Sequence, residues 1–349
     1  MPPTPTPDGT AMPEPILEFK DVHVHYHTDD GVVEAVRGVN YRVHPDEILA
    51  IVGESGCGKS QSSYAAMGLV QPPGRTPQGK ILFREKEGAN PIDLLSLGRN
   101  SKEMRAIRGG RLAMIFQEPM TALSPVHRIG TLIDEVLRLH TDLDAEARFK
   151  RACEMLTRVG IPDAAKRYKQ YSFEFSGGMR QRIMIAIALA CNPRLLIADE
   201  PTTGLDVTIQ AQILDLIKQV QAEFHIGVVL ITHDLAVVAE TAHRVAVMYL
   251  GRIVEEANVL ELFKQPRHPY TVALLQSVIG TQLSADGRLP TIQGTVPGPL
   301  ERVPGCPFHP RCQKAIAGLC ERELPRVRRI NPTTHVACHL YNEFPEDQP

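Results

Sequence analysis

The sequence lacks the features that mark proteins that bind nucleic acids or span a membrane. Lysine and arginine number 38 against 40 aspartates and glutamates, so the formal net charge is -2 and the basic excess usual in nucleic-acid-binding domains is missing. No apolar run approaches the ~18 residues that a membrane-spanning helix needs. The densest basic run, Arg326, Arg328 and Arg329, is expected to be a solvated surface.

The first residues also lack the marks of a secretory signal peptide. Residues 1–15 have neither a basic start nor an apolar segment, and their prolines predict a disordered leader. We therefore expect a cytoplasmic protein, in which the seven cysteines would be reduced, buried or metal-bound rather than paired in disulfides. The 349 residues, 43% of them hydrophobic, are enough for two or three domains.

The sequence does contain a glycine-rich loop between a predicted strand and a predicted helix. The apolar run Glu47–Gly53 is typical of a buried parallel strand, and the residues after Lys59 can continue as a helix. The loop GESGCGKS matches G-x-x-x-x-G-K-[ST] and comprises Gly53, Glu54, Ser55, Gly56, Cys57, Gly58, Lys59 and Ser60. Its backbone N–H groups and Lys59 would bind phosphates, and the Ser60 hydroxyl would ligate Mg²⁺. The sequence therefore predicts a nucleoside triphosphate site.

Two acidic residues follow a second apolar strand. Leu195–Ala198 is succeeded by Asp199 and Glu200. A carboxylate at this end of a strand beside the glycine loop can hold Mg²⁺, and its neighbour is suited to polarise the attacking water. The alternative, a solvated loop, is disfavoured by the position of the pair relative to the glycine loop.

Polar residues also follow two other predicted strands. Gln117 comes after Leu112–Phe116, and His233 comes after Val228–Thr232. Open α/β sheets place ligand-contacting groups at such strand ends, although either residue alone would more often be structural.

A second candidate anion site precedes a long helical run. Ser176, Gly177 and Gly178 stand directly ahead of MRQRIMIAIALAC, where a helix N-terminus would begin. One triphosphate does not need two such sites from one chain. Two chains arranged head to tail would each use this site for the other's nucleotide.

The order and spacing of these motifs resemble the nucleotide-binding subunit of ABC transporters. The motifs are the glycine loop, Gln117, FSGGM, LLIADE, GLD and His233, and the match covers about residues 16–265. The resemblance implies that Glu200 is the catalytic base, that His233 contacts the γ-phosphate, and that Gln117 senses both Mg²⁺ and the membrane partner.

The resemblance also assigns two further residues. It implies that Asp206 lies in the loop that the family calls the D-loop and that Tyr26 stacks on adenine. Met179 departs from the pattern, since the common signature has glutamine there, and we expect function to survive this loss of a polar contact.

The C-terminal part differs in composition from the rest of the chain. HPYT and GCPFHPRC resemble the C-terminal extension of oligopeptide and dipeptide transporter ATPases, and GKSQ in the glycine loop resembles the same branch. We expect an irregular C-terminal domain over 266–345, rich in Pro and Gly and with little core of its own.

Four of the seven cysteines lie in this C-terminal region. Cys306, Cys312, Cys320 and Cys338 fall within 33 residues, an arrangement that suggests a metal centre in place of a core. Zinc is the first physical candidate, but structural zinc sites favour C-x₂₋₄-C pairs and none occurs here. The subfamily resemblance implies instead a structural [4Fe-4S] cluster. The remaining alternative is four reduced cysteines packed as small hydrophobic residues.

Together these features predict an α/β fold. We expect a P-loop NTPase core of the RecA-like type with an antiparallel β subdomain, a helical signature subdomain over about 118–185, and the small C-terminal extension. The function implied by the resemblance is ATP hydrolysis, with Mg²⁺, that powers import of oligopeptides or dipeptides. The implied partners are two membrane permease subunits, a second paralogous ATPase and an extracytoplasmic solute-binding protein, with no nucleic acid.

Two competing functions are weaker. Soluble ABC ATPases that act on ribosomes or DNA usually carry two cassettes or a long coiled coil, and this chain has one cassette and no extended heptad run. A non-catalytic regulatory cassette is disfavoured because Lys59, Asp199, Glu200 and His233 are all present.

Overall fold

A computed structural model describes residues 13–117, 122–279 and 292–347, so most of the predicted leader lies outside the described residues. An eight-stranded sheet forms the centre of the chain, in the order β12-β13-β11-β10-β3-β9-β8-β7. Its parallel part consists of β10 (Arg244–Tyr249), β3 (Ile48–Val52), β9 (Gly227–Ile231), β8 (Leu195–Asp199) and β7 (Leu112–Ile115). All residues of β3, β7, β8 and β9 are buried, which explains why these strands are continuous apolar runs in the sequence.

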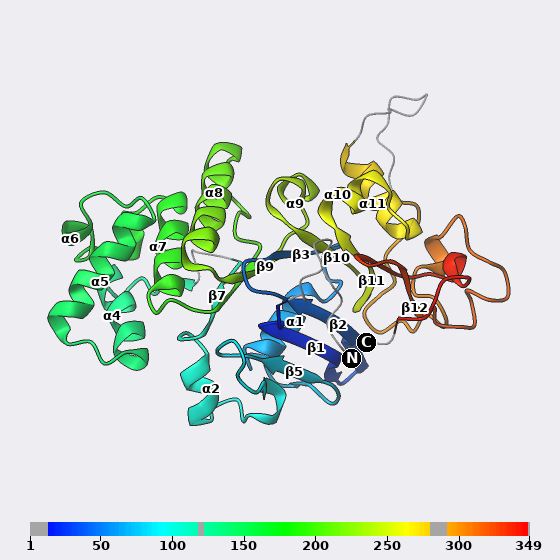
Figure 1. Cartoon of the computed structure of the whole chain (residues 1–349), viewed down its shortest axis with the longest axis horizontal. Helices are drawn as coiled ribbons and strands as arrows, with labels where there is room; N and C mark the ends of the chain where they lie inside the picture. Colours follow the sequence, from blue (N-terminus) through cyan, green and yellow to red (C-terminus); the bar gives the residue numbers. More distant parts are fainter. Residues whose placement is uncertain (1–12, 118–121, 280–291, 348–349) are drawn as a thin grey trace.

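A second, antiparallel sheet covers one side of the glycine loop and its helix. Its strands are β2 (Gly31–Val43), β1 (Leu17–Thr28), β5 (Lys80–Phe83), β6 (Ile92–Asp93) and the short β4 (Gly74–Arg75). The first helix, α1 (Lys59–Ala66), lies beside this sheet in Figure 1. Ala65 of α1 belongs to one apolar cluster with Val22 of β1 and Leu49 of β3, so the helix is packed between the two sheets. The antiparallel subdomain continues through η1 (Leu94–Ser96) and α2 (Lys102–Ile107).

The helical subdomain lies at one end of the molecule (Figure 1). It contains α4 (Ile129–His140), α5 (Ala145–Arg158), α6 (Ala164–Arg167), η2 (Ser172–Glu174) and α7 (Gly177–Leu189). Ile183 of α7 is fully buried and shares an apolar cluster with Met155 of α5 and Leu196 of β8. The following helix, α8 (Val207–Phe224), joins the same cluster through Ile213.

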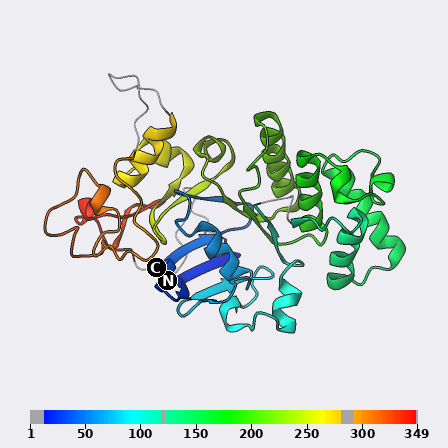
Figure 2. The ribbon, with the colours of Figure 1, turned by 180° about the vertical axis from the view of Figure 1, so that it is seen from behind.

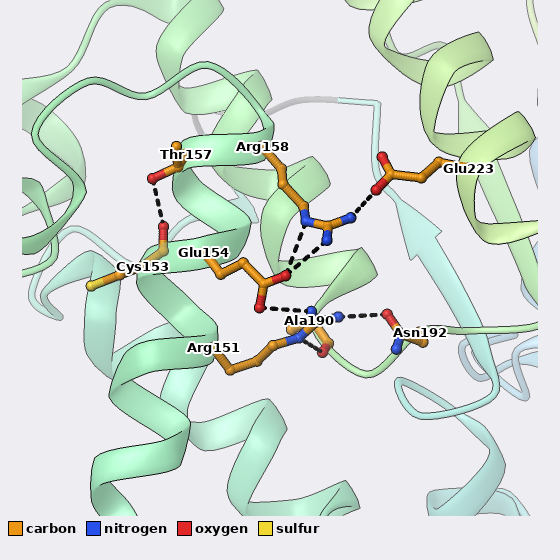
Figure 3. Close-up of polar contacts among 8 residues, drawn as sticks. All are labelled: Arg151, Cys153, Glu154, Thr157, Arg158, Ala190, Asn192 and Glu223. Atoms are coloured by element: carbon orange, nitrogen blue, oxygen red, sulfur yellow. Dashed lines mark hydrogen bonds and ion pairs between the residues drawn. The ribbon is translucent and has the colours of Figure 1, made fainter.

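Ion pairs at the surface join α5 to its neighbours (Figure 3). Arg158 pairs with Glu223 at the end of α8 and with Glu154 on its own helix. Arg151 also pairs with Glu154, at 3.1 Å, and donates hydrogen bonds to the Ala190 carbonyl and the Asn192 side chain after α7. These contacts connect three helices on the exposed side of the subdomain.

The C-terminal segment lies at the opposite end, as both views of the chain show (Figures 1 and 2). It follows α9 (Leu235–Thr241), β11 (Arg252–Asn258) and α10 (Val259–Lys264). It contains α11 (Pro269–Ile279), η3 (His309–Arg311), β12 (Val327–Asn331), β13 (Thr334–Ala337) and η4 (His339–Tyr341). The sequence predicts an irregular extension, but β13 pairs with β11 and β12 with β13, so this segment extends the central sheet by two strands.

The predicted α/β architecture, with its antiparallel and helical subdomains, is confirmed by these elements. In the described part of the chain, no helix combines the length and apolar character needed to cross a membrane.

Candidate nucleotide-binding site

The glycine loop, residues 53–60, connects β3 to α1, and two of its glycines sit against other backbone segments. A Cβ atom on Gly53 would lie 2.1 Å from the carbonyl oxygen of Met248, and one on Gly58 would lie 2.1 Å from that of Ala35. Gly58, at φ 104°, also has the left-handed conformation that favours glycine. No side chain can replace these glycines without moving the strands around the loop.

Lys59 occupies the centre of the loop. Its ammonium group donates hydrogen bonds to the carbonyl oxygens of Gly53, at 2.8 Å, and Glu54, at 3.1 Å. Its side chain is nearly buried, and α1 begins at this residue without a side-chain cap on its first N–H groups. Uncapped N–H groups and a buried cation together make a site for an anion such as phosphate.

Asp199, at the end of β8, lies beside Ser60 of α1. The Ser60 hydroxyl donates a 2.9 Å hydrogen bond to Oδ1 of Asp199. The Asp199 carboxylate is fully buried, its Oδ2 has no partner among the described residues, and burial raises its pKa to about 6. A buried carboxylate oxygen without a partner favours a bound cation, so the residues fit Mg²⁺.

Glu200 is held by three side chains from three strand ends. Gln117 donates a 2.9 Å hydrogen bond from Nε2 to the Glu200 Oε2, and Thr203 donates one of 2.9 Å to the same oxygen. Nδ1 of His233 lies 3.4 Å from Oε1 of Glu200. The backbone of Glu200 has a φ of +45°, in the left-handed region, and its N–H group donates to the carbonyl of Ile231 in β9. This strained residue is fixed from both its side chain and its backbone.

The structure therefore brings Gln117, Glu200 and His233 together beside Asp199, as the pattern of strand ends suggests. Thr203 is a member of the group that sequence reasoning missed. Its only signal in the sequence is its place three residues after Glu200, in the turn that follows β8.

Tyr26 lies on β1 near the start of α1. Its hydroxyl donates a short hydrogen bond to the side chain of Gln61, the residue after the glycine loop. Its ring edge lies close to Gly74 of β4, where an added Cβ would be 2.6 Å from the ring. The aromatic side chain is thus anchored beside the loop, half-buried.

The signature residues are in the helical subdomain. Ser176 is the N-cap of α7, and its hydroxyl accepts the N–H group of Met179 at 3.4 Å, while Gly178 lies so close to α8 that an added Cβ would be 2.7 Å from Ile209. Throughout residues 13–117, 122–279 and 292–347, no hydrogen bond or ion pair joins Ser176, Gly177 or Gly178 to the glycine loop.

The predicted D-loop residue Asp206 and the signature residue Met179 both make structural contacts. Asp206 caps α8 by accepting the N–H group of Ile209 at 3.0 Å. Met179, the residue that departs from the common signature, is half-buried and packs against the apolar cluster of the helical subdomain.

Comparison with known proteins agrees with this geometry. A family model described as "ABC transporter" matches residues 36–203, and one described as "Oligopeptide/dipeptide transporter, C-terminal region" matches residues 254–320. A dipeptide transport ATP-binding protein of Bacillus subtilis is 47% identical over 334 residues, 95% of this chain and 97% of its own length. The chain belongs to the ATP-binding subunits of oligopeptide and dipeptide ABC transporters.

Other members of this ABC transporter family are similarly close. A probable peptide ABC transporter ATP-binding protein of Sinorhizobium fredii is 47% identical, over 94% of this chain and 96% of its own length. Among solved structures, a dimeric ATP-binding cassette bound to ADP and phosphate in a post-hydrolysis state covers 70% of this chain and 98% of its own, with 26% identity and a TM-score of 0.60. The ATP-binding and ATPase character of the chain, with Mg²⁺ as the metal of the reaction, follows from this membership.

The predicted iron–sulfur cluster at Cys306, Cys312, Cys320 and Cys338 is wrong. Within the described ranges, no group of three or more histidine, cysteine, aspartate or glutamate side chains is arranged to hold a metal ion. Cys306 and Cys320 are instead buried in the apolar cluster around Phe308. Burial raises the pKa of Cys306 to about 11 and that of Cys338 to about 12, so both thiols are protonated at neutral pH when no metal is bound. Mg²⁺ requires no such group, because it is usually held by one or two carboxylates together with substrate phosphates.

Proposed function

We propose that this ABC transporter subunit hydrolyses ATP to power the import of oligopeptides or dipeptides through a membrane permease complex. The observation that carries the proposal is the placement of Glu200, held by Gln117, Thr203 and His233, beside the buried Asp199 and the glycine loop. The peptide and dipeptide transport names of the relatives support the substrate class.

Each side chain has a proposed role in hydrolysis. The N–H groups of residues 53–60 and the Lys59 ammonium bind the phosphates, and Tyr26 stacks on adenine. Ser60, Asp199 and Gln117 would hold Mg²⁺, which neutralises charge that develops on the phosphates. Glu200 orients and polarises the attacking water, because its carboxylate is fixed at the end of β8.

His233 and the signature residues complete the proposed site. His233 is exposed at the end of β9, where its ring can turn toward a γ-phosphate. Ser176, Gly177 and Gly178 would bind the nucleotide of a second ATPase chain, with Asp206 at the same interface. Their position in the helical subdomain, apart from the glycine loop, supports this head-to-tail arrangement.

The proposed partners are two permease subunits, a paralogous second ATPase chain and, through the complex, an extracytoplasmic solute-binding protein. The subunit would lie at the cytoplasmic face of the membrane and would not bind nucleic acid. The predicted docking surface for the permease is Gln117–Pro125, next to the nucleotide sensor. Of this surface, residues 118–121 lie outside the described residues.

The experiment that tests the proposal uses the transporter assembled from this chain with its permeases and companion ATPase, reconstituted in vesicles. We expect ATP-dependent uptake of short peptides and hydrolysis that depends on Mg²⁺. Glu200→Gln should bind ATP but hydrolyse it about 10²- to 10⁴-fold more slowly, because the variant loses its general base and this is the usual rate contribution of such a base. Lys59→Ala should instead weaken nucleotide binding.

Two results would contradict this proposal in different ways. Active hydrolysis without uptake of any short peptide would refute the substrate class while leaving the ATPase intact. Turnover close to that of the unaltered protein in Glu200→Gln would remove Glu200 from the role of base.

A further inference from the structure

Glu54 of the glycine loop forms an ion pair with a residue of the C-terminal segment. Nη1 of Arg311 lies 2.7 Å from Oε2 of Glu54, and Nη2 lies 3.1 Å from Oε1, so the pair is bidentate. The Arg311 side chain is only 4% exposed. The two residues are 257 positions apart in the chain, and a bidentate, part-buried pair fixes both groups in one geometry.

The backbone of Glu54 contacts the same segment through a second residue. Its N–H group donates a 2.9 Å hydrogen bond to the hydroxyl of Tyr270, which is fully buried near the start of α11. The other half of this peptide unit is the carbonyl of Gly53, which accepts the 2.8 Å hydrogen bond of Lys59. Because a peptide unit is planar and rigid, the Tyr270 hydroxyl and the Lys59 ammonium are linked through one peptide group.

Arg311 and Tyr270 are themselves held firmly. Nη1 of Arg311 also donates to the Tyr249 hydroxyl at 3.3 Å, and Nε donates to the Gln293 carbonyl at 3.1 Å. The rings of Tyr249 and Tyr270 are 4.6 Å apart, and both contact Phe308.

The start of α11 is also fixed. The buried carboxylate of Glu255 accepts the N–H groups of Arg267 at 2.7 Å and His268 at 2.8 Å, and Nδ1 of His268 accepts that of Tyr270 at 3.0 Å. The contact to the loop is therefore made by a rigid assembly of the central sheet, α11 and η3.

We propose that Arg311 and Tyr270 are positioning residues of the ATP site: the C-terminal segment sets the orientation of the Gly53–Glu54 peptide, so docking of this segment and nucleotide binding are coupled. Neither residue needs to touch the nucleotide. Tyr270 keeps the peptide plane in place when Lys59 turns from the Gly53 carbonyl to a phosphate, and Arg311 keeps the Glu54 carboxylate away from the phosphates. A free Glu54 carboxylate near the phosphates would oppose nucleotide binding, because like charges repel. The inference rests on the proposed ATP site and is independent of the transported substrate.

Coupling of this kind is reciprocal, and that gives the first readout. If the docked segment strengthens ATP binding, then ATP must stabilise the docked segment by the same factor. In the full-length chain, Mg²⁺ and ATP should slow hydrogen exchange at the backbone amides of residues 305–312. The same nucleotide should leave exchange in that region unchanged in Arg311→Met.

A double-mutant cycle on Glu54 and Arg311 supplies the second readout, the dissociation constant of ATP measured by calorimetry on the full-length chain. Arg311→Met leaves the Glu54 carboxylate free near the phosphates and should weaken ATP binding about tenfold, a usual size for coupling between sites. Adding Glu54→Gln removes that charge and should restore part of the affinity, so the two changes are not additive. Arg311→Lys keeps the positive charge but cannot form the bidentate pair, so its dissociation constant for ATP should lie between those of the unaltered chain and Arg311→Met.

Arg326→Met is the matched control, because Arg326 pairs with Glu346 at the surface of the same segment.

Tyr270→Phe tests the peptide contact with the least change to packing, since only the hydroxyl is lost. We expect ATP binding weakened by about threefold to tenfold, the loss of one hydrogen bond. The proposal is overturned if Arg311→Met and Tyr270→Phe lower the melting temperature but bind ATP with the dissociation constant of the unaltered chain. Should Arg311→Met fail to fold, Tyr270→Phe alone decides. An unaltered chain that binds no ATP would instead refute the ATP site itself.

Discussion

The helical subdomain and the C-terminal segment are both joined to the central sheet, but their ionic contacts lie in different surroundings. An apolar cluster supplies the packing in each case, through Ile183 at one end of the molecule and Phe308 at the other. The ion pairs around Glu154 in the helical subdomain are exposed, whereas the pair that joins the C-terminal segment to the glycine loop, Arg311 with Glu54, is largely buried.

This difference indicates how firmly each region is held. We call the contacts of the helical subdomain around Glu154 the helical joint, and the contacts of the C-terminal segment around Phe308 and Arg311 the C-terminal joint. Exposed ion pairs contribute little free energy to folding. Water can solvate their charged groups when a pair breaks, so the same side chains can pair again in another orientation. Breaking a buried pair leaves a charge without a partner, which is strongly unfavourable. The C-terminal joint therefore holds the glycine loop in one geometry, while the exposed contacts of the helical joint oppose a change of orientation only weakly.

The largest effect is expected where the C-terminal joint loses its packing. Phe308 is 2% exposed and contacts Tyr249 and Tyr270, so Phe308→Ala should lower the free energy of unfolding by about 3–5 kcal/mol. Because the chain has no tryptophan, near-ultraviolet circular dichroism of these tyrosines can follow urea unfolding. Leu324→Ala, an exposed leucine of the same segment, is the control. Equal losses in both variants would show that the cluster adds no stability.

A change of pH should affect the C-terminal joint by a smaller amount. Burial lowers the pKa of His268 to about 3, well below its ordinary 6.5. Between these values the unfolded chain binds the proton and the folded chain does not, so stability falls as the pH drops below about 6.5. A single group of this kind costs up to about 1.4 kcal/mol per pH unit within that window. Urea unfolding at pH 7 and pH 5.5 should show a loss of about 1 kcal/mol that His268→Gln lacks.

Glu255 is a second acid-titrating group at this contact, and it responds in the opposite direction. Burial raises the pKa of its carboxyl group above the ordinary value, so the folded chain binds a proton more readily than the unfolded one. Protonation of Glu255 at lower pH therefore stabilises the folded chain and offsets part of the loss of stability caused by His268. A pH slope that is the same in His268→Gln and the unaltered chain would contradict the assignment to His268.

The elements that surround the nucleotide could be predicted because each is a contiguous pattern. Glycines 53, 56 and 58, the apolar runs of β3, β7, β8 and β9, and the polar residue after each run are local in the sequence. The alternating residues of β1 and β2 likewise predict the antiparallel sheet. Buried parallel strands are the elements that an apolar run indicates most directly.

Contacts between distant residues could not be predicted in the same way. Glu54 was assigned to the phosphate loop, yet its carboxylate pairs with Arg311, and nothing near either residue indicates the other. The strands β12 and β13 are short, and their place in the central sheet depends on pairing with β11. The cysteines show the opposite error, because spacing in the sequence suggests a cluster but specifies no geometry, and Cys306 and Cys320 pack in an apolar core instead.

The smallest effect is expected at the exposed joint of the helical subdomain (Figure 3). Glu154 pairs with Arg151 and Arg158, and its side chain is 43% exposed. Glu154→Gln should therefore lower the free energy of unfolding by less than about 1 kcal/mol at low salt, the usual range for exposed pairs. The loss should shrink further in 1 M salt, where charges are screened within about 3 Å. Glu146→Gln, on the same helix and without an ion pair among the described residues, is the control. A loss of several kcal/mol that persists in high salt would mean that this joint is as rigid as the C-terminal one, and the contrast between the two ends of the molecule would not hold.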